Sequence, residues 1–223
     1  ALHAPQPLRI AHWSRIAGSP VDPVIDQRMA AVAAQLRGMG HHVTMADAPA
    51  AVHVFNRLAW PVLSATGLAA VLHDNTPKDD ARMTPALAAM LVTGRSLRAV
   101  DLFNAQVHQH ALRDAMDHVF ESVDVVLTPA CAAMPWPADH SHPTSIAGQR
   151  VDPRGHAVFT AFVNGAGLPA LALPAEPSPD GLPIGFQLIG PQGSDALLCA
   201  LGLAFERQHP QARRWPLPSP SES

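Results

Sequence analysis

The order of hydrophobic and polar positions along the chain predicts an α/β protein that opens with a strand, a helix and a second strand. The segments 8–13 (LRIAHW) and 41–46 (HHVTMA) are each typical of a short strand, and between them apolar residues recur at helical spacing over 21–40. Asp22 is a suitable N-cap and Pro23 suits the first helical position. Because a strand–helix–strand crossover typically joins parallel strands, we expect these two strands to lie parallel.

The middle of the chain reads as mostly helical. The predicted elements are, in order, a buried helix over 53–72, a polar loop over 74–83, and helices over 85–92 and 96–121. Pro61 lacks a backbone N–H and Gly67 is a weak helix former, so both are expected to kink or divide the helix over 53–72. Gly94 is expected to separate the two later helices.

The last part of the chain completes a sheet. The β-branched run 124–128 ends at Pro129 and is typical of a strand buried on both faces. The remaining predicted elements are a long loop over 129–155 rich in Pro, His, Gly and Ser, a short helix over 157–164, a hairpin of strands 168–174 and 184–190, a helix capped by Ser194 and ending near 209, and a Pro-rich tail over 210–223. The expected fold class is α/β, with a mixed central sheet flanked by helices.

Length and charge narrow the classes of function. The chain has 223 residues, 48% of them hydrophobic and 15% charged, enough to bury the core of one domain. Its 15 basic and 18 acidic residues give a net charge of −3, so there is no basic excess to neutralise nucleic-acid phosphates. The uncharged apolar stretch 58–72 is shorter than the roughly 20 residues of a membrane-spanning helix. We therefore expect neither a nucleic-acid nor a membrane partner.

The cysteines and the first residues favour a cytoplasmic protein. Cys131 and Cys199 lack the paired spacing of a disulfide framework or a zinc site. The opening residues lack the basic and apolar regions of a signal peptide. Residue 1 is Ala rather than Met, which we interpret as a cut point.

Three segments carry a family resemblance, and together they reach over residues 8–210. They are RIAGSPVDPVIDQRMAAVAAQLRGMGHHV, VFESVDVVLTPACAAMPWPA, and the stretch from FTAFVNGAGLPALALP to AFERQHP. In order, they resemble the later half of amidase signature enzymes. The third is the most specific, because these residues fall at the family's spacings: Asn164, Gly167, Pro169, Ala170, Pro174, Gly181, Pro183, Gly185, Gln187 and Gly190.

The resemblance implies that residues 1–223 are a single C-terminal portion of an amidase domain. Members of the family hydrolyse amides through a Ser-Ser-Lys triad and a serine acyl-enzyme, and the triad lies in the earlier half of a longer chain. This sequence has no Ser-Ser dipeptide, and Lys78 is its one lysine. Asp79 and Asp80 follow Lys78 and favour its charged form, which cannot act as a base. We therefore expect no catalytic residue here, an inactive chain on its own, and the upstream half of the amidase as its partner.

The same resemblance suggests which residues meet a small-molecule amide substrate. In the family, the loop after the strand 124–128 and the segment before the NGAGLPA turn face the pocket. The expected substrate-binding residues are Thr128, Trp136, Ala157, Phe159 and Phe162, and a structural role is the alternative for each. Relatives that act on glutamyl-tRNA have an acidic residue near the position of Ala157, so its absence here speaks against that substrate.

Other polar groups have a plain structural alternative. His110, Asp114 and His118 recur every fourth residue on a predicted helix, as metal ligands could, but a solvated polar face is the preferred explanation, because the sequence places no fourth ligand. No metal and no cofactor are expected. Loop residues Asp139, His140 and His142 are as ambiguous, Ser141 lacks a G-x-S-x-G elbow, and Cys131 is either a pocket residue or a small buried hydrophobe.

A second hypothesis belongs to another class of function. The chain could be a non-catalytic binding or assembly module descended from an amidase. An upstream lysine and Ser-Ser stretch in the reading frame would favour the amidase hypothesis, and a start codon at residue 1 would favour the module. A sheet without its earlier strands has open edges and an uncovered apolar face, so we expect the isolated chain to form a homodimer or aggregate.

Overall fold

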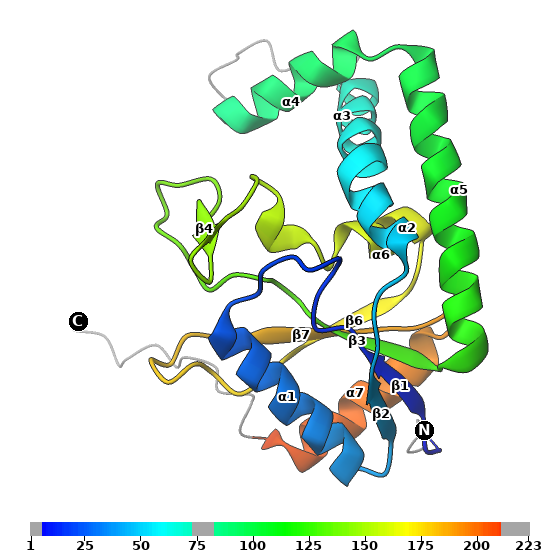
Figure 1. The fold of residues 1–223 in the computed structure, drawn as a ribbon, viewed down its shortest axis with the longest axis vertical. Helices are drawn as coiled ribbons and strands as arrows, with labels where there is room; N and C mark the ends of the chain where they lie inside the picture. Colours follow the sequence, from blue (N-terminus) through cyan, green and yellow to red (C-terminus); the bar gives the residue numbers. More distant parts are fainter. Residues whose placement is uncertain (1–5, 73–82, 211–223) are drawn as a thin grey trace, which may run out of the picture.

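The computed structural model describes residues 6–72 and 83–210 and contains a five-stranded sheet between two groups of helices (Figure 1). The strands of this sheet are β1 (Arg9–His12), β2 (His42–Met45), β3 (Val125–Pro129), β6 (Ala170–Pro174) and β7 (Gly185–Ile189). The helices are α1 (Pro23–Gly38), α2 (Ala50–Val54), the π-helical η1 (Phe55–Ala59), α3 (Trp60–Val71), α4 (Pro85–Ser96), α5 (Ala99–Ser122), the 3₁₀ turn η3 (Gly155–Ala157), α6 (Ala161–Ala166) and α7 (Asp195–Gln208). The strand order is β2-β1-β3-β7-β6.

The sheet is mixed, as the sequence predicts. β1 pairs in parallel with β2 and with β3, whereas β7 pairs antiparallel with both β3 and β6. Helices α1 and α7 lie on one face of the sheet, and α2, α5 and α6 stand on the other (Figure 1). The fold class is therefore confirmed as α/β, with a mixed central sheet flanked by helices.

Helix α1 forms where its sequence signals place it. The side chain of Asp22 accepts a hydrogen bond from the N–H of Val24 at 2.9 Å, and Pro23 occupies the first turn. The face that carries Ile25, Met29 and Leu36 is fully buried against the sheet. This face fixes α1 as the crossover between β1 and β2.

The β6–β7 hairpin is also confirmed, although its two strands differ in burial. Gly181, at φ +81°, lies in the turn region between them. β7 is buried along nearly its whole length because it lies between β3 and β6. β6 forms the edge of the sheet, and Ala170 and Ala172 are exposed there. At this end of the strand order, β6 is therefore the open edge of the sheet.

Pro61 does not divide the helix, because a π-turn accommodates the proline. α2, η1 and α3 form one continuous helical run from Ala50 to Val71. The N–H of Trp60 donates to the carbonyl of Phe55, five residues earlier, and Pro61 has no N–H to donate. One extra residue in the turn thus lets the helix pass the proline without a break.

The same continuity changes the membrane argument from sequence. Ala50–Val71 has 22 residues and a mean hydropathy of 1.2. Among the described residues, it is the one helix that is both long enough and apolar enough to span a membrane. Only 17% of its apolar window is buried. The sequence argument counted 58–72 alone and therefore underestimated this helix. Length and composition are weak evidence for a span, and α3 packs here against α4 and α5.

The expectation for Gly94 is corrected, because this residue does not separate helices but lies inside α4, which continues to Ser96. Gly167 ends α6 at φ +75°, a left-handed conformation that glycine adopts without strain. Ser194 stands at the start of α7 as expected, but its hydroxyl donates to the carbonyl of Pro191 at 2.6 Å and does not cap the helix.

The stability of the fold is expected to fall in mild acid because of His41. This side chain is 5% exposed, and its Nδ1 accepts a hydrogen bond from the N–H of Leu8 at 3.1 Å. Burial, and secondarily the neighbouring His42, lower the pKa of His41 from its ordinary value of 6.5. The neutral form is therefore the stabilising one, and its contribution is present above pH 6.5 and decreases as the pH falls below that value.

Urea unfolding at about pH 7.5 and about pH 5.5 would measure this decrease. The His41→Asn variant retains an acceptor and cannot titrate, so it should lose less unfolding free energy between the two conditions than the natural chain. His110→Asn, on the exposed surface of α5, is the matched control. Equal losses in the natural chain and His41→Asn would show that His41 does not cause the pH dependence.

Candidate functional site

The strand order places a crevice at the carboxyl ends of β1 and β3. Within the main sheet, the chain leaves β1 toward β2 on one side, and leaves β3 toward the edge strand β6 on the other. In open α/β sheets, ligands bind where neighbouring connections diverge in this way. The loops that follow β1 and β3, residues 13–20 and 130–144, are therefore the first place to search for a site.

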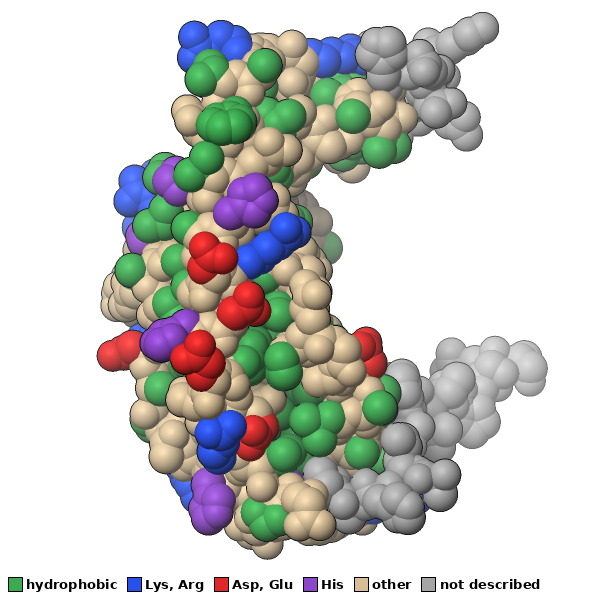
Figure 2. Space-filling model, turned by 90° about the vertical axis from the view of Figure 1, so that its right-hand side faces the viewer, with side chains coloured by type: hydrophobic (Ala, Val, Ile, Leu, Met, Phe, Trp, Pro, Cys, Tyr) green, Lys and Arg blue, Asp and Glu red, His purple; other side chains and the backbone are tan. Residues whose placement is uncertain are grey.

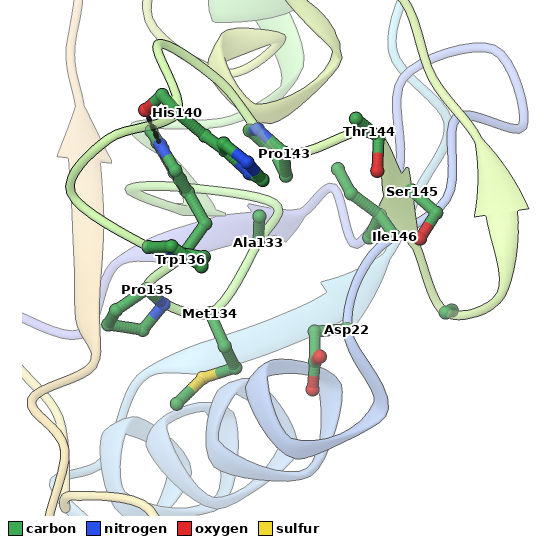
Figure 3. Close-up of a pocket in the computed structure, with 12 residues that line it drawn as sticks. Asp22, Ala133, Met134, Pro135, Trp136, His140, Pro143, Thr144, Ser145 and Ile146 are labelled. Atoms are coloured by element: carbon green, nitrogen blue, oxygen red, sulfur yellow. Dashed lines mark hydrogen bonds between the residues drawn. The ribbon is translucent and has the colours of Figure 1, made fainter.

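One pocket opens beside the loop after β3 and the start of α1 (Figure 3). Its volume is about 380 Å³, within the usual range of about 300–1,000 Å³ for ligand pockets. The indole N–H of Trp136 donates to the carbonyl of His140 at 2.9 Å and holds the loop closed. The lining comprises Asp22, Ala133, Met134, Pro135, Trp136, Pro137, His140, Pro143, Thr144, Ser145, Ile146 and Ala147.

The loop behind this pocket is more ordered than the sequence suggests. Within the predicted loop 129–155, β4 (Ser145–Ile146) and β5 (Gln149–Arg150) form a small antiparallel hairpin. Ala147 and Gly148 turn it, both at positive φ, as two-residue hairpins require. The hairpin separates the first pocket from a second one.

The second pocket, of about 310 Å³, lies between the loop after β1, the α2–η1 helix and the segment 150–158. It is strongly basic, because Arg57, Arg150 and Arg154 line it together with the single carboxylate of Asp152. The other lining residues are Ile16, Ser19, Pro20, His53, Asn56, Val151, Gly155, Ala157, Val158 and Ala161.

His156 connects the walls of the two pockets. Its ring lies 4.8 Å from the ring of Trp136, measured between centroids, and its carbonyl accepts the N–H of Ala132 at 3.0 Å. Burial lowers the pKa of His156, and His142 and Arg154 lower it further. Its Nδ1 is buried with no hydrogen-bond partner. A neutral imidazole with a spare ring nitrogen therefore stands at this junction.

The five residues expected to bind substrate occupy different environments. Trp136 lines the first pocket and Ala157 lines the second. Thr128, Phe159 and Phe162 are 0% exposed and belong to the core. Substrate contact stays a prediction for all five, and for the three buried residues it would require the site to open.

Gln187 joins two of the buried residues. Its side-chain N–H groups donate to the hydroxyl of Thr128 at 3.2 Å and to the carbonyl of Phe159 at 3.0 Å. The amide thus ties β7 to the end of β3 and to the segment before α6. It fixes the position of the chain that follows Ala157.

Gln187→Leu is expected to lower the unfolding free energy by about 1–3 kcal/mol, because it leaves the buried carbonyl of Phe159 without a donor. Chemical denaturation measures the loss. Gln149→Leu, at an exposed position in β5, is the control and should change the free energy by about 0.5 kcal/mol or less. A Gln187→Leu chain as stable as the control variant would mean that these hydrogen bonds contribute nothing net.

The other polar residues that the sequence marks as candidate ligands or nucleophiles either lie away from both pockets or belong to the loops around them. His110, Asp114 and His118 are exposed on α5, where His118 pairs with Glu121 at 3.0 Å. The described part of the chain contains no group of three or more potential metal ligands. Ser141 and His142 share a hydrogen bond of 2.8 Å in an exposed loop, and the Cys131 thiol donates to the carbonyl of His156 at 3.4 Å. Lys78 and residues 211–223 of the tail lie outside the described residues.

Sequence reasoning missed the basic lining of the second pocket. Arg57 comes from the π-turn, whereas Arg150 ends strand β5, far along the chain, and Arg154 follows it in a loop. The RVDPR stretch at 150–154 is a local signal of concentrated charge, but nothing in the sequence indicates that Arg57 faces it. The arrangement supplies cations and shaped walls, which bind and orient a ligand.

Comparison with known proteins gives matches over most of the chain. A family model described as Amidase matches residues 1–199. The chain is 31% identical over 217 residues to a putative amidase, AmiC, of Mycobacterium bovis, a match that covers 93% of this chain and 45% of that protein. It is 38% identical over 107 residues to a glutamyl-tRNA(Gln) amidotransferase subunit from Chlamydia trachomatis, covering 46% of this chain and 20% of the relative.

Solved structures share the fold. A bacterial aryl acylamidase of the amidase signature family superposes with a TM-score of 0.78 at 24% identity, over 93% of this chain and 45% of that chain. A 6-aminohexanoate cyclic dimer hydrolase superposes with a TM-score of 0.81 at 19% identity, over 96% of this chain and 48% of that chain. These matches cover most of this chain, but the chain spans only about half the length of each of these relatives. Since the family model covers most of its residues, the chain belongs to the amidase family.

Proposed function

We propose that this chain is the C-terminal half of an enzyme that hydrolyses the amide bond of a small molecule. Its membership of the amidase family supports the reaction class, and the match to about half of each relative supports a partial enzyme. The observation that carries the proposal is the pair of pockets at the carboxyl ends of β1 and β3, where the fold gathers the walls of a ligand site.

In the proposed reaction, the nucleophile comes from the upstream half. A serine oxygen adds to the amide carbonyl, the C–N bond breaks, and the nitrogen leaves as an amine after it gains a proton. Water then cleaves the ester of the acyl-enzyme and regenerates the serine. The residues of this chain form part of the pocket that holds the substrate during both steps.

The exposed apolar surface supports a need for a partner. The α3–α4 arm stands away from the sheet, and Figure 2 shows a hollow between this arm and the body. Large apolar side chains are exposed on η1, α3, α4 and α5: Leu58, Val71, Leu87, Val92, Val100, Phe103 and Val107. Where exposed apolar side chains form a contiguous patch, the patch usually marks an interaction site. In the proposal, the upstream half covers part of it, and the isolated chain self-associates.

Amidase assays on the chain and on the intact gene product test the proposal. Amine release from a panel of simple carboxamides should stay at background for residues 1–223 alone. The gene product should turn over, and a serine-directed fluorophosphonate should label a serine upstream of residue 1, located by peptide mass spectrometry. Turnover by the chain alone, or labelling of Ser141, would contradict the proposal.

Light scattering and a hydrophobic dye distinguish the assembly module from the half-enzyme. We expect the isolated chain to associate or bind the dye, and the upstream polypeptide to suppress both effects. A dye-negative monomer at high concentration that does not respond to the upstream polypeptide would favour the non-catalytic module.

A further inference from the structure

The second pocket concentrates unpaired positive charge. Arg57, Arg150 and Arg154 line a cavity of about 310 Å³ with the single carboxylate of Asp152, which forms no ion pair with any of them. His53 also lines the cavity. A volume near the lower end of the range for ligand pockets suits a small group rather than a large molecule.

In the described part of the chain, the side chains of these arginines lack the ion pairs that three other arginines form. Arg9, Arg15 and Arg98 each pair with an aspartate. Within the described ranges, the side chains of the three arginines of the second pocket form neither an ion pair nor a hydrogen bond. Their planar donor forks match the oxygens of a carboxylate or a phosphate, and they are available to an anion from outside this chain.

Two features of the wall hold the basic groups in place. The guanidinium of Arg154 lies over the ring of Trp60, 5.7 Å from its centroid, which restrains a side chain that would otherwise move freely. The side-chain N–H of Asn56 donates to the carbonyl of Val158 at 2.7 Å and ties the π-turn to the opposite segment. Asn56 Oδ1 and Trp60 Nε1 are buried without a hydrogen-bond partner, so the hydrogen bonding of these two side chains is incomplete.

We propose that this pocket binds a negatively charged group, a carboxylate or a phosphate, on the amide substrate. The inference rests on the proposed function for the assignment of the anion to a substrate, and it adds the class of substrate. The position supports it, because Ala157, an expected substrate residue, lines the same pocket. The alternative occupant is an acidic side chain of the upstream half, which would pair with the same arginines.

The first experiment measures binding without turnover. The intact gene product is titrated calorimetrically with benzoate, phenyl phosphate and benzamide, which share a ring and differ in charge. We expect the anions to bind and benzamide to bind at least tenfold more weakly. Arg57→Gln and Arg154→Gln should each weaken the binding of the anions by about 10- to 100-fold, since each removes a charge-assisted contact. Benzoate and phenyl phosphate together show which anion the pocket prefers.

The matched control is Arg113→Gln, an exposed position on α5 outside the pocket, which should leave anion binding unchanged. Equal binding of benzoate and benzamide, or no binding of either anion, would overturn the inference. The inference would also be overturned if the Arg57→Gln and Arg154→Gln variants lowered the melting temperature of the gene product but kept its preference for anions. The arginines would then pair with carboxylates of the protein itself.

The second experiment connects the pocket to the reaction. Acetanilide and 4-acetamidobenzoate carry the same amide, and only the latter carries a carboxylate. The ratio of their KM values should favour 4-acetamidobenzoate and should collapse by about 10- to 100-fold in Arg154→Gln. Hydrolysis of both amides with equal KM would overturn the inference and leave the proposed function intact. Anion binding without hydrolysis of any amide would contradict the proposed function and uphold the anion site.

Discussion

Phe162→Ala is expected to lower the unfolding free energy of the chain by about 3–5 kcal/mol, the cost of removing a large aromatic side chain from a packed core. Phe162 is 0% exposed, and its ring lies 6.0 Å from the ring of Trp13, which is 1% exposed. The surrounding core cannot close over the lost ring without moving β1 or α6. Urea or thermal unfolding measures the change.

The control for this variant is Phe103→Ala. Phe103 is 64% exposed on α5, so its removal should change the unfolding free energy by about 0.5 kcal/mol or less. The comparison also separates two roles for Phe162, which the sequence suggests as a substrate residue. If Phe162→Ala left stability unchanged but raised KM in the gene product, the ring would be a substrate contact rather than part of the core.

Gly94→Ala is the second variant with a large expected effect. A Cβ at this position would lie 2.0 Å from the carbonyl oxygen of Ala65 and 2.6 Å from its carbonyl carbon. Because the obstacle is the backbone of α3, the two helices must separate to admit a single methyl group. We expect a loss of about 1–3 kcal/mol in unfolding free energy, together with altered packing of the α3–α4 arm.

Gly67→Ala provides a matched comparison in the neighbouring helix. A Cβ at Gly67 would have no atom within 4 Å, and the residue is exposed inside α3. Alanine is the better helix former, so this variant should gain up to about 1 kcal/mol. Opposite signs for the two variants would confirm the close approach of α3 and α4, whereas a stabilising Gly94→Ala would contradict it.

Local sequence determined much of the secondary structure. Asp22 and Pro23 begin α1 because they satisfy the first turn of a helix. The apolar run 124–128 forms β3, and the turn around Gly181 returns the chain antiparallel. The resemblance of the three segments placed the chain in its family, which the family model confirms. These features depend on neighbouring residues or on short motifs, so the sequence alone carries them.

The structure decided how distant segments meet. The sequence marks Pro61 as a breaker, but a π-turn removes the conflict, and Gly94 became a packing position only because α3 lies against α4. The site depends on tertiary contacts in the same way. Arg57 and Arg154 belong to separate segments, and only the packing of the α2–η1 helix against the loop before α6 gives them one pocket. Periodicity and capping record interactions within a few residues, whereas a pocket is made by long-range packing, and for that reason its basic character appears only in the folded chain.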